Sequence, residues 1–281
     1  MPETCAHNET GVCSWSLREH GPGHLADPLI DELRVPTVQL ALDALIDHHP
    51  APADTIAALR DRGVRIPSAM MAPAAEDYST IASIRTTGGF RPDSTWHANT
   101  ERARVLAALA HETGIPLVTM HAGSFIDGAG GLQQVMLARI RTIARIFADA
   151  GVRVAFETGH ERAHDTLRML NELDTPNAGV NFDPANIVLY SSGDPVESLA
   201  LLLPHVLQCH IKDALPAASR DEWGSETVVG AGSVDWPGFF ATLATTDRTI
   251  PLMVEREAGE SRAQDIAHAL AFVRTQRGDA T

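Results

Sequence analysis

Four short apolar runs in the second half of the chain each end directly at an ionisable residue. The runs and their final residues are Val152–Phe156 with Glu157, Val180–Phe182 with Asp183, Val206–Cys209 with His210, and Pro251–Val254 with Glu255. Short apolar runs of this kind are typical of buried strands. After Asp183, Pro184 removes a backbone donor and ends the strand. The repeated pattern predicts strands that each carry a polar side chain at the carboxyl end.

Apolar strand patterns alternate with helical patterns along the whole chain. The other expected strands are Gly11–Leu17, Val35–Leu42, Val64–Met71 and Ile115–Met120. Helices are expected from about Asp27 and over Asp54–Arg62, Ser94–His111 with Ser94 as N-cap, Leu132–Ala150, Glu161–Leu173, Pro195–Leu203, Trp236–Ala244 and Ser261–Gln276. The segment Ala72–Pro92 is expected to be a long irregular loop with a functional role.

Eight strands alternating with about eight helices predict an α/β fold, the (β/α)₈ TIM barrel. We expect a single domain over residues 1–281, in which residues 1–10 form a loose N-terminal extension. A doubly wound open sheet is the alternative, but no G-x-G-x-x-G turn follows the first strand.

The charge and the cysteines narrow the class of protein. The formal net charge of −14 argues against a nucleic-acid or anionic-membrane partner, which would require clustered Lys and Arg. No stretch approaches the roughly 20 apolar residues of a membrane span, and no signal peptide precedes the first strand, so we expect a cytoplasmic protein. The cysteines Cys5, Cys13 and Cys209 lack a metal-type spacing and are expected to be reduced and structural.

In a barrel the carboxyl ends of all strands meet at one mouth. Glu157, Asp183, His210 and Glu255 would therefore share a pocket. One acid after a strand is as often a helix cap or loop residue, but four such residues at the same end favour a metal site. Three carboxylates and one imidazole suit a single divalent ion, with Mn²⁺ favoured and Co²⁺, Mg²⁺ and Zn²⁺ as alternatives.

Further residues could contact a substrate at this mouth. Lys212 lies two residues beyond His210 and should point the same way, where it could hold a substrate oxygen or pair with Asp213 or another acid at the rim. Three residues either line the pocket or are structural: Trp15, His121 and His160.

Five segments together carry a resemblance to a known family. They are V-A-F-E ending at Glu157, N-F-D-P-A-N around Asp183, H-I-K-D from His210, G-A-G-S-V-D-W from Gly230 and L-M-V-E-R-E around Glu255. In this order they resemble the xylose isomerase-like TIM-barrel superfamily of sugar and sugar-phosphate isomerases and epimerases. The resemblance implies a small-molecule sugar as partner and leaves open a homo-oligomer.

In the ketose 3-epimerase branch, the resemblance implies a metal held by Glu157, Asp183, His210 and Glu255. The two glutamates would also form the acid/base pair on opposite faces of the substrate. Abstraction of a proton beside a carbonyl would give an enediolate, and hence epimerisation or isomerisation of a ketose, ketose phosphate or 3-oxo sugar.

Two positions depart from that branch. Ketose epimerases of this type commonly carry His where this chain has Asn186, and Arg where it has Pro216. Asn186 and Lys212 are therefore candidate replacements that contact the substrate, as in relatives acting on 3-oxo-glycosides or inosose.

Other activities remain open on the same scaffold. A metal-dependent eliminase, a hydride-shift aldose–ketose isomerase and a non-catalytic sugar-binding barrel are the alternatives. The AP endonuclease branch is disfavoured, because the chain is acidic and lacks the extra strand-end histidines of a zinc cluster.

Overall fold

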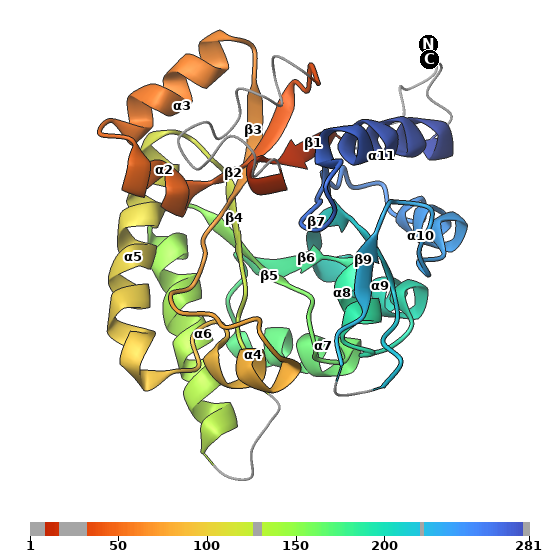
Figure 1. Cartoon of the computed structure of the whole chain (residues 1–281). Coiled ribbons are helices and arrows are strands. Elements are labelled where there is room, and N and C mark those ends of the chain that lie inside the picture. The colour runs from red at the N-terminus through yellow and green to blue at the C-terminus, as the bar shows by residue number, and fades with distance from the viewer. Residues whose placement is uncertain (1–8, 17–32, 126–130, 220–221, 278–281) are drawn as a thin grey trace.

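The computed structural model describes residues 9–16, 33–125, 131–219 and 222–277 (Figure 1). Within them, eight parallel strands close into a barrel in the order β1-β10-β7-β6-β5-β4-β3-β2. The strands are β1 Thr10–Cys13, β2 Thr37–Ala41, β3 Arg65–Met70, β4 Leu117–Met120, β5 Arg153–Glu157, β6 Ala178–Phe182, β7 Val206–Ile211 and β10 Leu252–Val254. The predicted (β/α)₈ barrel is confirmed.

Helices cover the outside of the barrel, where α5 packs against α6 and α11 lies against β1 and β10 (Figure 1). The helices are α2 Leu42–His48, α3 Pro52–Asp61, α4 Ile81–Thr87, α5 Asp93–Glu112, α6 Leu132–Asp149, α7 Ala163–Leu173, α8 Pro184–Leu189, α9 Pro195–Leu202, α10 Trp236–Leu243 and α11 Arg262–Arg277. Two short 3₁₀ segments are η1 Ser14–Ser16 and η4 Leu203–His205. In the described residues no helix is long and apolar enough to cross a bilayer.

The interior of the barrel contains a layer of fully buried polar side chains. Its members are Gln39, Ser68, Thr119, Asn181, Gln208 and His210. A hydrogen bond from the amide of Gln208 on β7 to that of Gln39 on β2 joins strands that are not neighbours in the barrel, so it crosses the barrel interior. Barrel interiors are usually filled by branched apolar residues. Here the apolar core lies instead mainly between the strands and the helices.

One buried carboxylate organises the segment between β7 and α10. Asp213 accepts hydrogen bonds from the backbone N–H groups of Ala214, Gly230, Gly232 and Val234 and from the indole of Trp236. A fully buried carboxylate requires such donors. The same segment forms a small antiparallel hairpin from β8 Asp213–Leu215 and β9 Ser225–Thr227. The G-A-G-S-V-D-W segment thus serves to wrap around Asp213.

Several local predictions were wrong. Ser94 is not an N-cap, because α5 already begins at Asp93 after Pro92, and no side chain caps it. The segment 72–92 is not irregular throughout, since it contains α4, capped by Thr80. The expected first strand ends at Cys13 and gives way to η1. Two helices, α2 and α8, had not been anticipated. The helix expected from Asp27 lies outside the described residues, as do residues 1–8 of the expected extension.

Two glycines allow the loops after β3 and β4 to touch. Gly89 has φ +60° and Gly123 has φ +81°. A Cβ on Gly89 would lie 2.1 Å from the backbone nitrogen of Gly123, and a Cβ on Gly123 would lie 2.1 Å from the carbonyl oxygen of Gly88. This contact fixes how the long loop after β3 sits over the barrel mouth.

We expect Gly89→Ala to destabilise the protein more than Gly114→Ala. Gly114 has a similar φ of +65° but nothing within 4 Å of an added Cβ, so its change should cost only the backbone strain of about 1–2 kcal/mol. Gly89→Ala adds a steric clash worth about 1–3 kcal/mol more. Urea unfolding of both variants measures the difference, and equal losses would argue against the close approach.

Candidate metal centre

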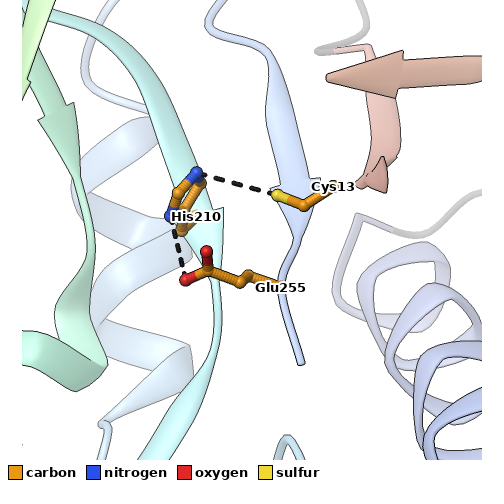
Figure 2. A group of neighbouring side chains, drawn as sticks. All are labelled: Cys13, His210 and Glu255. Carbon is orange, nitrogen blue, oxygen red and sulfur yellow. Dashed lines mark hydrogen bonds and ion pairs between the residues drawn. The ribbon is translucent and has the colours of Figure 1, made fainter. Parts of the chain in front are cut away.

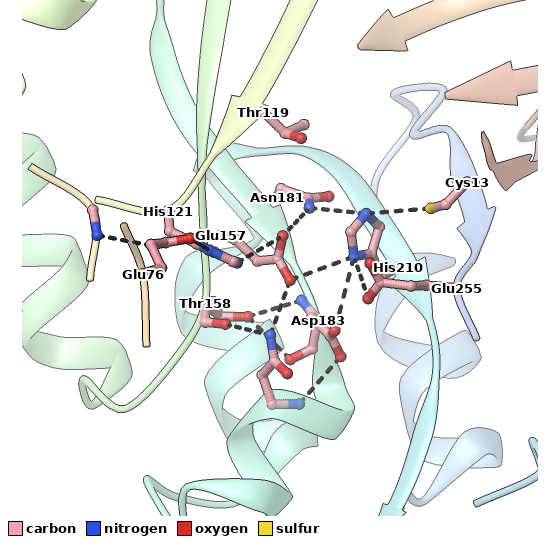
Figure 3. Close-up of polar contacts among 12 residues, drawn as sticks. Cys13, Glu76, Thr119, His121, Glu157, Thr158, Asn181, Asp183, His210 and Glu255 are labelled. Atoms are coloured by element: carbon pink, nitrogen blue, oxygen red, sulfur yellow. Dashed lines mark hydrogen bonds and ion pairs between the residues drawn. The ribbon is translucent and has the colours of Figure 1, made fainter. Parts of the chain in front are cut away.

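Four side chains from four strand ends surround one point at the barrel mouth (Figure 3). They are Glu157, Asp183, His210 and Glu255, and one ligand atom from each lies within 4.8 Å of all the others. Nδ1 of His210 is 3.2 Å from Oε2 of Glu255, 3.5 Å from Oε1 of Glu157 and 3.8 Å from Oδ2 of Asp183. The structure therefore brings together all four residues of the predicted metal site.

The position of Asp183 follows from its local sequence. Pro184 begins α8, and Oδ1 of Asp183 caps this helix by accepting from the backbone N–H groups of Ala185 and Asn186. The backbone N–H of Asp183 donates to the hydroxyl of Thr158. Since Oδ1 is engaged in the cap, Oδ2 is left without a hydrogen bond and faces the cluster.

Opposing effects set the charges of the cluster. Burial raises the pKa of Glu157, but His210 and His121 outweigh it and hold that pKa well below its usual range. Burial likewise raises the pKa of Glu255, and Lys212 together with His210 lowers it to about 2. For Asp183 burial dominates, and its pKa is raised despite Lys212.

The pKa values of the two basic side chains, His210 and Lys212, shift upward, opposite to those of the two glutamates. Burial lowers the pKa of His210, yet the surrounding carboxylates, Glu255 first, raise it well above its usual value. Burial also lowers the pKa of Lys212, but Glu255 and Glu257 raise it well above its usual value. The cluster is thus a highly charged group of buried side chains, and the fold holds them together despite the cost of desolvation.

The donor atoms fit a divalent cation. Oδ2 of Asp183 and Nδ1 of His210 are buried, make no hydrogen bond and point at the same place. The three carboxylates of the cluster and the ammonium of Lys212 together carry a net charge of −2, so a doubly charged ion bound with a neutral imidazole would balance the charge of these groups. Carboxylate oxygens with one imidazole suit Mn²⁺, Mg²⁺, Co²⁺ or Zn²⁺.

The two glutamates are held by different partners. Glu157 accepts hydrogen bonds from the side-chain amides of Asn186 at 2.9 Å and Asn181 at 3.2 Å. Glu255 accepts from the indole of Trp15 at 2.7 Å and from the ammonium of Lys212 at 2.9 Å. Glu157 is therefore held by two neutral amides, whereas Glu255 is held by a neutral indole and a cation.

A cavity of about 510 Å³ opens above the cluster. Both apolar and polar side chains line it, and they include Trp15, Met70, Met71, Met120, Glu76, Tyr78, His121, Asn186, Tyr190, Lys212, Glu157, Glu255 and Glu257. Trp15, His121, Asn186 and Lys212, which were predicted to contact a substrate, therefore line the same cavity.

Lys212 pairs with acids, though not with Asp213. Its ammonium lies 2.7 Å from Oε2 of Glu257 as well as beside Glu255, while Asp213 is engaged by the backbone of the following loop. His160 lies apart from the main cavity. It lines an adjoining pocket, where Nε2 is 2.9 Å from Glu161 and the ring packs against Tyr190.

Glu76 and Tyr78 had not been singled out from the sequence. Both contact Nδ1 of His121, with the phenol oxygen of Tyr78 at 2.8 Å and Oε2 of Glu76 at 3.2 Å. On its other side, Nε2 of His121 is 3.7 Å from Glu157. The only signal was the unusual length of the segment 72–92, which contains both residues.

A buried thiol lies behind His210 (Figure 2). Sγ of Cys13 is 3.8 Å from Nε2 of His210, on the side of the ring away from the carboxylates. Burial raises the pKa of the Cys13 thiol to about 12, so it is a neutral thiol at neutral pH. Cys13 and Cys209 are both free and buried, as expected, and Cys5 lies outside the described residues.

A family model described as xylose isomerase-like TIM barrel matches residues 33–276. The chain belongs to this family. A crystal structure in it, a xylose isomerase domain protein from Planctomyces limnophilus, has a TM-score of 0.79 and 28% sequence identity, and the match covers 89% of this chain and 90% of that chain.

Two curated proteins match part of this xylose isomerase-like chain. A 3-oxo-isoapionate decarboxylase from Pectobacterium atrosepticum is 27% identical over 128 residues, which are 44% of this chain and 46% of that protein. An inosose dehydratase from Clostridium botulinum is 25% identical over 147 residues, which are 47% and 49%. The chain thus spans about half the length of the curated relatives it matches.

We expect Mn²⁺ binding to release about one proton. Because the pKa of His210 lies well above 6.5 in the metal-free protein, its imidazole carries a proton at neutral pH that a bound ion must displace. Below that pKa, the Mn²⁺ affinity should fall about tenfold for each pH unit lowered.

Calorimetry in two buffers of different ionisation enthalpy measures the proton count. His160→Gln serves as the control, because His160 lies in the adjoining pocket, and its proton count should match that of the wild-type protein. Binding with no release of protons would exclude His210 as a ligand.

Proposed function

We propose that this protein is a divalent-metal-dependent isomerase or epimerase of a sugar or an oxidised sugar derivative. The observation that supports this most directly is the placement of two glutamates beside the same imidazole nitrogen, under a cavity of sugar size. The ion expected at Glu157, Asp183, His210 and Glu255 would polarise the substrate carbonyl and stabilise negative charge on its oxygen.

In this mechanism the glutamates move the proton. Glu157 accepts a proton from the carbon next to the carbonyl, and its hydrogen bonds from Asn181 and Asn186 keep the carboxylate aimed at the cluster. Glu255 takes a proton from the ammonium of Lys212, which donates to its Oε2, and delivers that proton to the same carbon from the other side, which inverts the carbon. The proton held by Glu157 then returns to Lys212 through solvent, and the two glutamates exchange roles for the opposite epimer.

The cavity wall supplies the remaining contacts. The indole of Trp15 is held in place by its bond to Glu255 and can pack against the apolar face of a sugar ring. Asn186, His121 and Lys212 present donors to substrate hydroxyl or carbonyl oxygens. The names of the partial relatives, a decarboxylase of a 3-oxo acid and an inosose dehydratase, support a substrate with a carbonyl beside hydroxylated carbons.

A second candidate is β-elimination of water from such a substrate. Lys212 favours it, because its ammonium lies in the cavity beside Glu255 and can donate a proton to a leaving hydroxyl. A glutamate would take the proton beside the carbonyl, and the hydroxyl would leave with the lysine proton as water. The same first step thus serves both activities.

Solvent deuterium exchange tests the proposal. The Mn²⁺-loaded protein in D₂O is mixed with ketoses, ketose phosphates, inososes and 3-oxo-glycosides, and NMR follows the protons beside each carbonyl. Deuterium in a product with the same molecular formula as the substrate, apart from the isotope, would support epimerisation or isomerisation. A product that has lost one molecule of water would support elimination. Conversion without deuterium would point to hydride shift. Neither exchange nor conversion, together with saturable sugar binding, would favour a non-catalytic barrel.

We expect Glu157→Gln and Glu255→Gln each to lower kcat about 10²–10⁴-fold, because each removes a carboxylate that carries a proton. Circular dichroism and metal analysis check that each variant is folded and loaded. Glu112→Gln, at the exposed end of α5, is the matched control and should retain activity. Full activity in either glutamate variant would exclude the two-base mechanism.

A further inference from the structure

We propose that Gln39 is a positioning residue that keeps a proton on Nε2 of His210 and thereby leaves Nδ1 available to a metal ion. The inference rests on the metal centre of the proposed function. It concerns Gln39 in the buried polar layer beneath the carboxylates, a residue that none of the proposed steps uses. Gln39 lies on β2, on the side of the His210 ring away from the carboxylates.

The amide groups of this layer have defined orientations. The ionised carboxylate of Glu157 can only accept, so Nδ2 of Asn181 is the end that donates to it, and Oδ1 of Asn181 faces Gln208. Nε2 of Gln208 must therefore be its donor end, which donates to Oδ1 of Asn181 at 3.1 Å and to Oε1 of Gln39 at 2.8 Å. Oε1 of Gln208 is left to accept from the hydroxyl of Ser68. A chain of donors and acceptors thus fixes each amide in turn.

At Nε2 of His210 two of these amides compete. Oε1 of Gln39, an acceptor, lies 3.0 Å away, and Nδ2 of Asn181, a donor, lies 3.1 Å away. If Nε2 carries a proton, it donates to Gln39 and Nδ1 can be bare. If Nε2 is bare, it accepts from Asn181 and the ring proton sits on Nδ1, facing the carboxylates. Only the first arrangement allows Nδ1 to bind an ion.

Gln39 is strongly held in the orientation that favours the first arrangement. Its Nε2 donates to the hydroxyl of Thr119 at 2.8 Å, and its Oε1 also faces the thiol of Cys13 at 3.4 Å. Rotating the amide would point an NH₂ group at two donors, Nε2 of Gln208 and the thiol of Cys13. In a layer with no exposed surface, such unpaired groups are costly. Gln39 therefore selects the state of His210 that can bind metal.

Three variants test this role by Mn²⁺ affinity, measured by calorimetry. Gln39→Met keeps the volume but removes the acceptor, and we expect about 10–100-fold weaker binding. Gln39→Glu keeps an acceptor for His210, and the Thr119 hydroxyl can turn to donate to its second oxygen, so affinity should recover to near the wild-type value. Ser68→Ala removes a bond of the same layer that does not reach His210, and should leave affinity unchanged.

Wild-type affinity in Gln39→Met would overturn the proposal. So would an equal loss in Ser68→Ala, because the effect would then be a general loosening of the barrel. Thermal unfolding without metal confirms that each variant is folded.

Nitrogen-15 NMR of the imidazole gives a second readout that a merely structural role would not move. In metal-free protein in alkaline buffer, we expect Nε2 of His210 to be protonated in the wild type and in Gln39→Glu, and bare in Gln39→Met. A bare Nε2 in the wild type would overturn the proposal even if Gln39→Met did not fold. Failure of the wild type to bind any divalent ion would instead count against the proposed function, and this spectrum would still decide the role of Gln39.

Discussion

Everything at the barrel mouth depends on the burial of three carboxylates around one imidazole. Glu157, Asp183 and Glu255 have little contact with water, and without compensation their mutual repulsion would open the site. Lys212 provides one positive charge and His210 another, and hydrogen bonds from Trp15, the asparagines and the α8 backbone provide the rest. The strands and the polar layer below them are arranged to hold this costly group of charges at one point.

The same constraint explains why the surroundings are so extensively hydrogen-bonded. Oδ1 of Asp183 is occupied by the start of α8, which leaves a single oxygen for the cluster. Both oxygens of Glu157 and of Glu255 have at least one donor. Each carboxylate is therefore oriented before any ligand arrives, and such preorganisation reduces the reorganisation needed when charge develops on a substrate.

The sequence predicts the barrel and the four-residue cluster because both depend on short-range patterns. An apolar run that stops at an acid before Pro184 defines a strand end, and parallel strands bring such ends together. The contacts of Glu76 and Tyr78 were not predictable in this way, since they depend on the crossing of loops at Gly89 and Gly123.

The sequence does indicate buried, hydrogen-bonded amides at Gln39, Asn181 and Gln208. Each is a single amide within an apolar strand, and such a group needs a buried partner. Which partner it finds depends on the closure of the barrel, which joins β2 to β7 across the interior. The wrong N-cap prediction at Ser94 and the unexpected helices α2 and α8 have a different cause. The starting residue of a helix and the formation of a short helix depend on tertiary contacts more than on intrinsic propensity.

The separate roles of strands and loops have a consequence for how this site could change. The proposed metal ligands stand on barrel strands or directly after them, whereas Glu76, Tyr78 and Tyr190 reach the cavity from connections outside the barrel. Insertions or substitutions in those connections would reshape the cavity without disturbing the charge balance beneath it. The charged cluster can thus be inherited intact while the residues that line the cavity above it diverge.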